Sequence, residues 1–417
     1  MTISRRSLFR GGSSALAAAG IAARSSSAEE KQKDPLADLK NLTAGVQKQT
    51  PEDYQARMER ARRLMVEQKM DLLYLSGGTS MEYFSGIRWG LSERMFAMLI
   101  PARGDVVYIC PKFEEGRGRE QIRLGTDIRT WEEDESPYLV VREVLKDRKI
   151  AAGTVAVEPS VREFVVDGMS RACPGARFVN GDTITQGCRM IKTKKELDYM
   201  ALAAEITHQA FAAGFRTLRE GMSTGELGRT ISAAHMRLGA PGYGAVSFGP
   251  NAAFPHGSSM ERSLKPGDVV LVDGGCRVEG FQSDVTRTVV FGKPSERIKQ
   301  VWDIVKKAQD AALAAARPGV PCEAVDAAAR KVIVDAGYGP DYKYFTHRLG
   351  HGIGLDGHEC PYLVKGNQLP LQPGMTFSDE PGIYIVGEFG VRTEDVIYLA
   401  EDGAHFFRNT TPTLETY

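Results

Sequence analysis

The sequence predicts two consecutive domains, an α/β domain over residues 51–187 and an α+β domain over residues 188–417. In the first domain, short apolar runs alternate with stretches of helical spacing, which is typical of an α/β fold. In the second domain, a pair of helices and a hairpin are followed by another pair of helices and further strands. This order indicates an internal duplication. The 417 residues are enough to bury the cores of two or three domains.

The α/β domain is expected to begin with a helix over residues 54–70, because Met58, Ala61 and Met65 share one helical face. The segment at residues 76–86 is expected to be a loop. Further helices are predicted over residues 140–146 and 161–170, and strands over residues 71–75, 96–100, 106–109 and 154–157.

The α+β domain contains four long stretches of helical spacing, and a Pro-Gly break at residues 318–319 separates the last two. Between the two pairs lie two β-branched runs around a glycine-rich turn, which predict a β-hairpin over residues 269–290. The predicted helices cover residues 196–219, 224–238, 298–316 and 323–336.

The predicted hairpin carries two acids that we expect to lie close together. With the turn tip at residues 278–279, beside Gly280, Asp273 lies directly opposite Asp284. Facing side chains of an antiparallel pair have Cβ atoms roughly 4.5–5.5 Å apart, and like charges there repel. Such a pair requires a shared proton or a cation between the carboxylates. The hairpin therefore indicates half of a metal site, although a solvated hairpin with two unrelated acids would look the same.

Candidate ligands for the other half of the site come later in the chain. Residues 347–361 contain three histidines, and four glycines there argue against a regular helix. Glu380 precedes a proline, and Glu394 lies on an expected strand with Arg392 two residues earlier on the same face. Carboxylates with one imidazole suit divalent ions such as Mn²⁺, Co²⁺ or Zn²⁺.

These residues lie within motifs of a known family. The order Asp-x10-Asp, His, Glu and Glu resembles that of the pita-bread metallopeptidases, which include methionine aminopeptidase, aminopeptidase P, prolidase and creatinase. The resemblance is strongest to the Xaa-Pro peptidases. It implies a catalytic domain of the α+β pita-bread type, a pseudo-duplicated, curved antiparallel sheet with helices. It also implies a smaller α/β creatinase/prolidase-like domain in front, which caps the active site and helps to form a homodimer or homotetramer. The motifs are PHG at residues 255–257, SDVTRT at 283–288, HGIGLDGHE at 351–359 and EPGIYI at 380–385.

The resemblance implies two divalent metal ions per subunit, Mn²⁺ in the first place and Co²⁺ or Zn²⁺ as alternatives. By resemblance, Asp284 and Glu394 bridge both ions. Asp273 binds one ion, while His351 and Glu380 bind the other. Glu380 also accepts the proton of the attacking water.

Further residues are expected to act on the peptide. The resemblance implies that His256 and His358 stabilise the negative charge that develops on the attacked carbonyl, and that His347 lines the pocket. Arg392 orients Asp273 or the substrate terminus, and Tyr384 completes the site. The implied reaction is hydrolysis of Xaa-Pro bonds in small peptides, either releasing an N-terminal residue or splitting Xaa-Pro dipeptides.

Other classes of function remain open. A non-peptidase member of the same fold, such as a metal-dependent small-molecule amidohydrolase or a sulfonium lyase, could keep the ligands, because small changes in the pocket decide the substrate. A non-catalytic binding module is a further alternative, against which the complete ligand set argues. The formal net charge is zero, which argues against nucleic acid as a partner.

One residue departs from the family pattern. Asp379 stands directly before Glu380, where relatives usually carry an apolar or small residue. Neighbouring residues on a strand point to opposite faces, so we expect Asp379 to face away from the metal site.

The N-terminus is expected to be an export signal and no part of the fold. Residues 4–9, SRRSLF, resemble a twin-arginine motif, and a weakly apolar stretch and small residues follow up to residue 28. We therefore predict a twin-arginine signal peptide over residues 1–28 and a polar linker over residues 29–50. The expected partner is the twin-arginine export machinery, and the expected location is periplasmic or extracellular. A disordered basic tail is the alternative.

Overall fold

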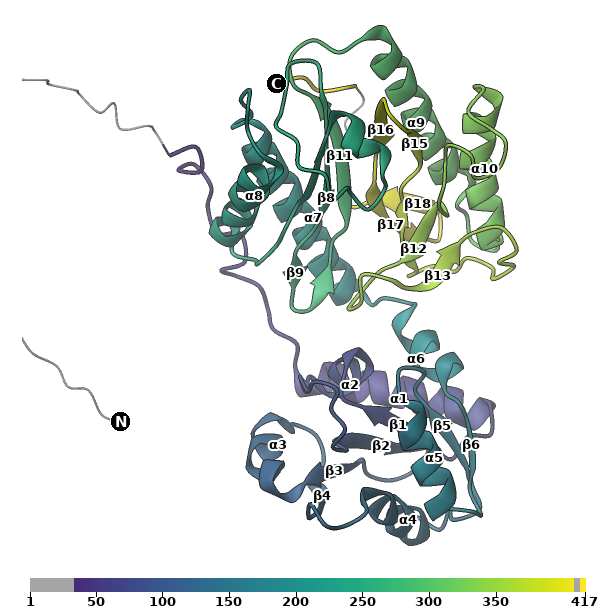
Figure 1. The fold of residues 1–417 in the computed structure, drawn as a ribbon. Helices are drawn as coiled ribbons and strands as arrows, with labels where there is room; N and C mark the ends of the chain where they lie inside the picture. Colours follow the sequence, from purple (N-terminus) through teal and green to yellow (C-terminus); the bar gives the residue numbers. More distant parts are fainter. Residues whose placement is uncertain (1–33, 409–412) are drawn as a thin grey trace, which may run out of the picture.

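The computed structural model describes residues 34–408 and 413–417, and these form two domains joined through helix α6 (Figure 1). The predicted export segment, residues 1–28, lies outside the described residues. Among the helices that are described, none combines the length and the hydrophobicity needed to cross a membrane.

The first domain is built on one six-stranded sheet with the strand order β4-β3-β2-β1-β5-β6. The central strand β1 is apolar and fully buried from Leu72 to Leu75, and it pairs antiparallel with β2 and parallel with β5. The strands predicted over residues 96–100 and 106–109 are observed as β2 and β3, which pair antiparallel. The strands are β1 (Leu72–Ser76), β2 (Ala97–Pro101), β3 (Val107–Pro111), β4 (Asp127–Trp131), β5 (Thr154–Val157) and β6 (Arg177–Asn180).

Helix α1 of the first domain begins as its sequence predicts. Thr50 and Asp53 form a capping box, a proline occupies the first turn, and the predicted face with Met58 and Met65 is buried. The prediction of a loop at residues 76–86 was wrong, because α2 forms there between two glycines. That helix is too short to show helical periodicity in the sequence. The helices are α1 (Pro51–Glu67), α2 (Thr79–Ser85), α3 (Glu115–Gln121), α4 (Pro137–Asp147), α5 (Glu163–Ala172) and α6 (Asp182–Arg189).

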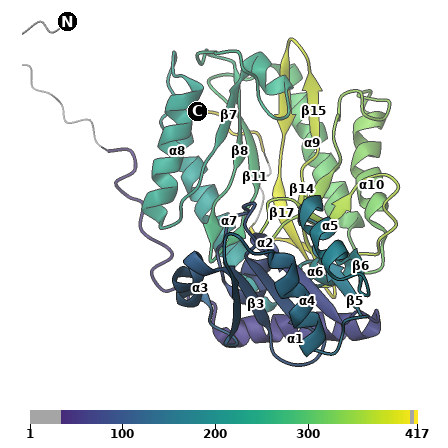
Figure 2. The same cartoon turned by 60° about the horizontal axis from the view of Figure 1, so that its bottom comes forward.

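Two pairs of long helices flank the strands of the second domain, as the turned view shows (Figure 2). All four predicted helices are confirmed to within a turn at either end. Thr193 and Glu196 form a capping box at the start of α7, and Ser223 and Glu226 form another at the start of α8. The helices are α7 (Lys194–Phe215), α8 (Thr224–Leu238), α9 (Glu296–Ala315) and α10 (Cys322–Asp335).

The antiparallel strands of the second domain form one group for each helix pair, which confirms the pseudo-duplicated α+β fold. The first group has the order β11-β8-β7, and the second has the order β13-β12-β14-β17-β18. Thr286 and Glu394 exchange backbone hydrogen bonds of 3.1 and 3.3 Å and so connect the two groups at the centre of the domain. The strands are β7 (Ala245–Phe248), β8 (Val269–Gly274), β9 (Arg277–Val278), β10 (Phe281–Gln282), β11 (Val285–Val290), β12 (Gly350–Gly352), β13 (Glu359–Leu363), β14 (Thr376–Asp379), β15 (Gly382–Ile385), β16 (Phe389–Arg392), β17 (Asp395–Ala400) and β18 (Gly403–Phe406).

The predicted hairpin exists, but its predicted register was wrong. The two turn residues are Glu279 and Gly280, with φ of 49° and 89°, which is the double left-handed geometry of a type I′ turn. Asp273 therefore pairs with Thr286 rather than with Asp284. Since Thr286 and Asp284 are two residues apart, the two acids still share a face, as diagonal neighbours.

Residues 34–50 pack against the second domain before the chain enters the first domain, and Figure 1 shows this purple segment beside α8. The backbone N–H of Leu42 donates to Leu238 at the end of α8, at 2.9 Å. The amide Nε2 of Gln49 donates to the backbone carbonyl of Glu279 at the hairpin tip, at 2.9 Å. Asp34 at the start of the segment pairs with Arg237 of α8 at 2.5 Å, so the segment is anchored at both ends.

Candidate metal centre

The predicted site residues gather around one cavity of about 210 Å³ in the second domain. All five predicted metal ligands line it, and so do His256, His347, His358 and Arg392. Tyr384 is absent from the lining but contacts two residues that belong to it. The complete lining is Tyr243, Pro255, His256, Asp273, Asp284, His347, Arg348, His351, His358, Glu380, Arg392 and Glu394.

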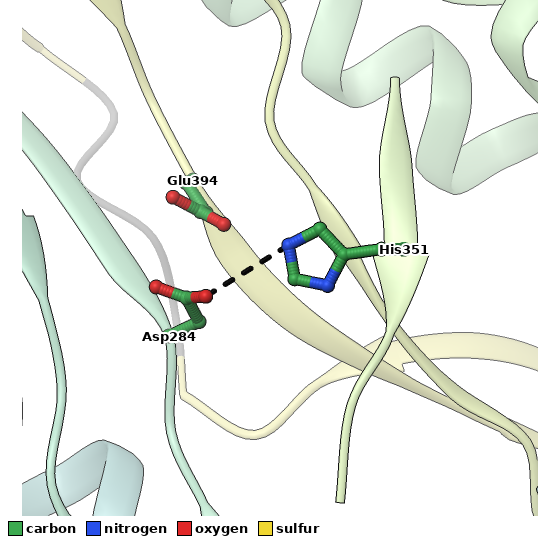
Figure 3. Close-up of side chains that lie close together, drawn as sticks. All are labelled: Asp284, His351 and Glu394. Atoms are coloured by element: carbon green, nitrogen blue, oxygen red, sulfur yellow. Dashed lines mark ion pairs between the residues drawn. The ribbon is translucent and has the colours of Figure 1, made fainter. Parts of the chain in front are cut away.

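Asp284, His351 and Glu394 form the centre of this arrangement (Figure 3). One ligand atom from each lies within 4.8 Å of the others, a spacing that could hold a metal ion. The three side chains come from the start of β11, from β12 and from the junction of β16 and β17. These three residues are far apart in the sequence and come together because the two strand groups meet at this point.

The imidazole of His351 is oriented by its neighbours. Its Nδ1 lies 3.1 Å from the backbone carbonyl of Gly352, and a carbonyl can only accept, so Nδ1 carries the hydrogen. The other nitrogen, Nε2, lies 3.3 Å from Glu380 Oε1 and 3.8 Å from Asp284 Oδ2. With Nδ1 protonated, loss of the Nε2 proton leaves the Nε2 lone pair facing the carboxylates, as a metal ligand requires.

Arg392 connects the opposite side of the site. Its side chain is 3% exposed and pairs with Asp273 Oδ2 at 2.8 Å. It also donates to the hydroxyl of Tyr384 and to the backbone carbonyl of Pro255, both at 3.0 Å. The Tyr384 hydroxyl lies 2.8 Å from Nε2 of His347, whose Nδ1 donates to a backbone carbonyl, so the tyrosine donates to His347. Arg392 thus fixes the position of Asp273 directly and that of His347 through Tyr384.

Thr286 also belongs to the site, and the sequence patterns did not single it out. Its buried hydroxyl donates to Glu394 Oε2 at 2.6 Å and accepts from Arg392 Nε at 3.0 Å. Tyr243 and Arg348 line the cavity as well and were not predicted. Thr286 could have been predicted from the correct hairpin register, because it faces Asp273 there. Tyr243 and Arg348 belong to no ligand pattern in the sequence.

The site contains more negative than positive charge. Burial, with Asp273 nearby, raises the pKa of Asp284 to about 8. Burial and the neighbouring Asp284 raise the pKa of Glu394 well above its usual value. Burial opposes ionisation of Glu380 too, but the hydrogen bond with His351 and the charge of the nearby histidines outweigh it and lower this pKa to about 2. Such a set of oxygens is stabilised by bound divalent cations, so the residues fit the metal ions that the sequence predicts.

Two histidines lie at the rim of the cavity. His256 and His358 are both exposed, and the His358 ring stacks on His351 with ring centroids 3.6 Å apart. Burial and the neighbouring His351 lower the pKa of His358. Both rings are accessible to a molecule that enters the cavity.

Asp379 does not line the cavity, which agrees with the expectation that it faces away from Glu380. The residue is fully buried, and neither of its carboxylate oxygens has a hydrogen-bond partner among the described residues. Its backbone pairs with Asp395, and Gln309 of α9 donates to its carbonyl at 3.3 Å. Burial, reinforced by Asp395, raises the pKa of Asp379 well above its usual value.

Comparisons with known proteins agree with this fold. Residues 57–191 match the creatinase/prolidase N-terminal domain, and residues 198–401 match metallopeptidase family M24. The chain is 34% identical over 367 residues to the Xaa-Pro dipeptidase of Lactobacillus delbrueckii subsp. lactis, covering 86% of this chain and 98% of the relative.

Solved structures of similar proteins lead to the same result. A prolidase from Thermococcus sibiricus has a TM-score of 0.79 at 33% identity and covers 88% of this chain and 99% of its own. A dipeptidase from Mycobacterium ulcerans has a TM-score of 0.82 at 34% identity, with 89% and 99% covered.

The duplicated sheet with its cluster of acids and one imidazole defines a metal-dependent hydrolase of the pita-bread type. The matches carry the assignment one step further. The chain belongs to metallopeptidase family M24, with a creatinase/prolidase N-terminal domain, and it is an enzyme of the metallopeptidase class. Membership of this family implies divalent metal ions.

Proposed function

We propose that this enzyme hydrolyses Xaa-Pro peptide bonds with two divalent metal ions. The observation that carries the proposal is the convergence of four acids and one imidazole on a single cavity, with further histidines at its rim. The named relatives, an Xaa-Pro dipeptidase and a prolidase, support the bond specificity.

The donor set suits two ions better than one. Asp284 and Glu394 would bridge the ions, Asp273 would bind one ion, and His351 with Glu380 would bind the other. Mn²⁺ is the first candidate because the donors are mostly carboxylate oxygens, with Co²⁺ or Zn²⁺ as alternatives. When bound, such ions would supply Lewis acidity and lower the pKa of the attacking water.

The protein groups have separate tasks in the reaction. Glu380 would accept the proton of the attacking water, because the neighbouring histidines lower its pKa and keep its carboxylate ionised at neutral pH. His256 and His358 stand at the rim, where their N–H groups can donate to the oxygen of the attacked carbonyl. Arg392 holds Asp273 in place, and through Tyr384 it orients His347.

An Xaa-Pro bond is a tertiary amide without an N–H, so peptidases that bind that N–H cannot use it. The test is turnover of Gly-Pro and of a Gly-Pro-Ala tripeptide by the Mn²⁺-loaded protein, with Gly-Ala as the control. Release of proline from Gly-Pro alone identifies a dipeptidase, and release of glycine from the tripeptide identifies an aminopeptidase. Faster cleavage of Gly-Ala, or no cleavage of either proline peptide, would refute the proposal and favour a non-peptidase activity.

The location and the assembly of the enzyme are also part of the proposal. Residues 1–28 would direct export by the twin-arginine route, and the mature protein would be a periplasmic or extracellular homodimer or homotetramer. This route carries folded proteins, which suits an enzyme that must acquire its ions first. Replacing Arg5 and Arg6 with lysine should retain the protein inside the cell, and unchanged export would contradict the signal. Light scattering of the mature chain tests the oligomer.

A further inference from the structure

We propose that Arg189, the last residue of α6 in the first domain, is a positioning residue for His358 in the active site. The inference rests on the proposed function only in taking His358 as the group that donates to the substrate carbonyl. It assigns the first domain a part in the reaction itself, through contacts with the loop that carries this histidine.

The His358 loop is held from the first domain on both sides of the histidine. Two residues before it, Asp356 accepts a hydrogen bond from Thr79 Oγ1 at 2.6 Å and pairs with Arg189 Nη2 at 2.5 Å. One residue after it, Glu359 pairs with the same Nη2. A single guanidinium thus holds the chain two residues before and one residue after His358.

The pair with Glu359 is buried, whereas the Asp356 side chain is 40% exposed. The side chains of Arg189 and Glu359 are 9% and 6% exposed, and Lys192 pairs with Glu359 at 2.6 Å with 1% exposure. Two cations therefore balance Asp356 and Glu359. Removing one partner of a buried pair leaves a charge without compensation, so the remaining groups must rearrange.

His358 has few other restraints. Its ring makes no hydrogen bond to any group in the part of the chain that the structure describes, and its one ring contact is the stack on His351. Gly354 and Gly357 on the same loop lower the intrinsic stiffness of the backbone. The position of the ring therefore depends on the residues that flank it.

The loop also has space behind it. A second cavity of about 140 Å³ is lined by His358, Asp356 and Arg189 together with Asp182 and Gln186 of α6. In three of these lining residues, Asp182 Oδ1, Gln186 Oε1 and Arg189 Nε are buried without a hydrogen-bond partner in residues 34–408 and 413–417. Without the Arg189 contacts, the loop can move into this polar space and carry His358 away from the metal centre.

A second buried pair between the domains provides a matched control. Arg57 of α1 pairs with Glu196 of α7 at 2.7 Å, with side-chain exposures of 7% and 3%. This pair resembles that of Arg189 in burial and in joining the two domains, but it does not contact the His358 loop. Loss of Arg57 should therefore lower stability without displacing His358.

The experiment is a double-mutant cycle on the metal-loaded full-length enzyme with an Xaa-Pro substrate. Arg189→Gln should lower kcat roughly 100-fold with little change in KM, since a displacement of about 1 Å can have that effect. In the His358→Ala background the same substitution should change kcat less than about twofold. Arg57→Gln should leave kcat within about twofold of the wild type. An equal loss with and without His358, or an unchanged kcat in Arg189→Gln, would overturn the proposal.

Hydrogen exchange of residues 353–359 provides a readout that needs no turnover. Arg189→Gln should accelerate exchange in this segment roughly tenfold or more, whereas Arg57→Gln should not. If the wild type cleaves no Xaa-Pro substrate, the proposed function fails, and this measurement still decides whether Arg189 holds the loop. If Arg189→Gln does not fold, Thr79→Val is the substitute, because it removes the other contact to Asp356. It is expected to accelerate exchange of residues 353–359 as well, but by a smaller factor. Unchanged exchange of this segment in whichever of the two variants is measured would refute the inference.

Discussion

Thr286 connects two charged groups of the metal site, so a substitution that removes only its hydroxyl tests how the site is held. Oγ1 donates to Glu394 and accepts from Arg392, and the side chain is 0% exposed. Valine has nearly the same shape. Thr286→Val therefore leaves a carboxylate oxygen and a guanidinium N–H buried without this partner, while the packing is preserved.

The expected loss follows from these two hydrogen bonds. A hydrogen bond to a charged group contributes about 1.5–3 kcal/mol. We expect the free energy of unfolding of the metal-free protein to fall by about 3 kcal/mol, because the two bonds share one hydroxyl and are not independent. Loss of a group that orients a metal ligand weakens binding by about 10–100-fold, so the Kd for Mn²⁺ should rise by that factor.

Urea denaturation and isothermal titration calorimetry measure the two quantities. Thr288→Val is the matched control, because Thr288 lies two residues further along the same strand and is 4% exposed. Its hydroxyl donates to the carbonyl and accepts from the N–H of Arg392, at 2.8 and 3.2 Å, and contacts no ligand. The control should lose stability but keep its affinity for Mn²⁺. If Thr286→Val binds Mn²⁺ as tightly as the wild type, or if both variants lose affinity equally, the hydroxyl does not orient Glu394.

Three further predictions concern the acids of the site. Asp284→Asn should lose bound metal and turnover together, which elemental analysis and a Gly-Pro assay of the same sample would show; full turnover would contradict the two-ion proposal. In the metal-free native protein the pKa of Asp284 is about 8, above its ordinary 3.8, so the native state keeps a proton that the unfolded chain loses between these values. The free energy of unfolding in urea should therefore fall as the pH rises through this window. Over the same range the affinity for Mn²⁺ should rise about tenfold per pH unit for each proton displaced. If neither quantity changes with pH, Asp284 is already ionised in the metal-free protein. Asp379→Asn should keep the metal content, because the side chain lies outside the cavity. Because the pKa of Asp379 is raised in the native state, the free energy of unfolding of the wild type falls as the pH increases above 3.8. Asparagine does not titrate, so the free energy of unfolding of Asp379→Asn in urea should increase relative to that of the wild type from pH 4 to pH 8.

The sequence was sufficient for the four long helices of the second domain and for a set of five candidate ligands that line one cavity. Long amphipathic segments such as 224–238 are predictable because their periodicity extends over several turns, and the ligands lie in motifs with fixed spacing. The hairpin register was missed because Glu279, a residue that seldom adopts positive φ, occupies the left-handed turn beside Gly280. A shift of the turn by one residue was enough to move Asp273 from facing Asp284 to facing Thr286.

Side chains that act through contacts between distant segments were harder to predict. The position of Arg189 beside the His358 loop depends on how the two domains meet, and no local pattern encodes that. For Asp379, strand alternation indicated the direction of the side chain, but only the packing of α9 shows that this direction leads into the core and not to solvent.

The path of residues 34–50 determines how the first domain is connected to the second. The chain is fastened to the second domain at Gln49, crosses into the first domain at α1, and returns through α6 to α7. The first domain is therefore attached by two crossings of the chain, and buried ion pairs such as Arg57–Glu196 and Arg189–Glu359 also hold it to the second domain. Any widening of the space between the domains must break these buried pairs as well as bend the two crossings.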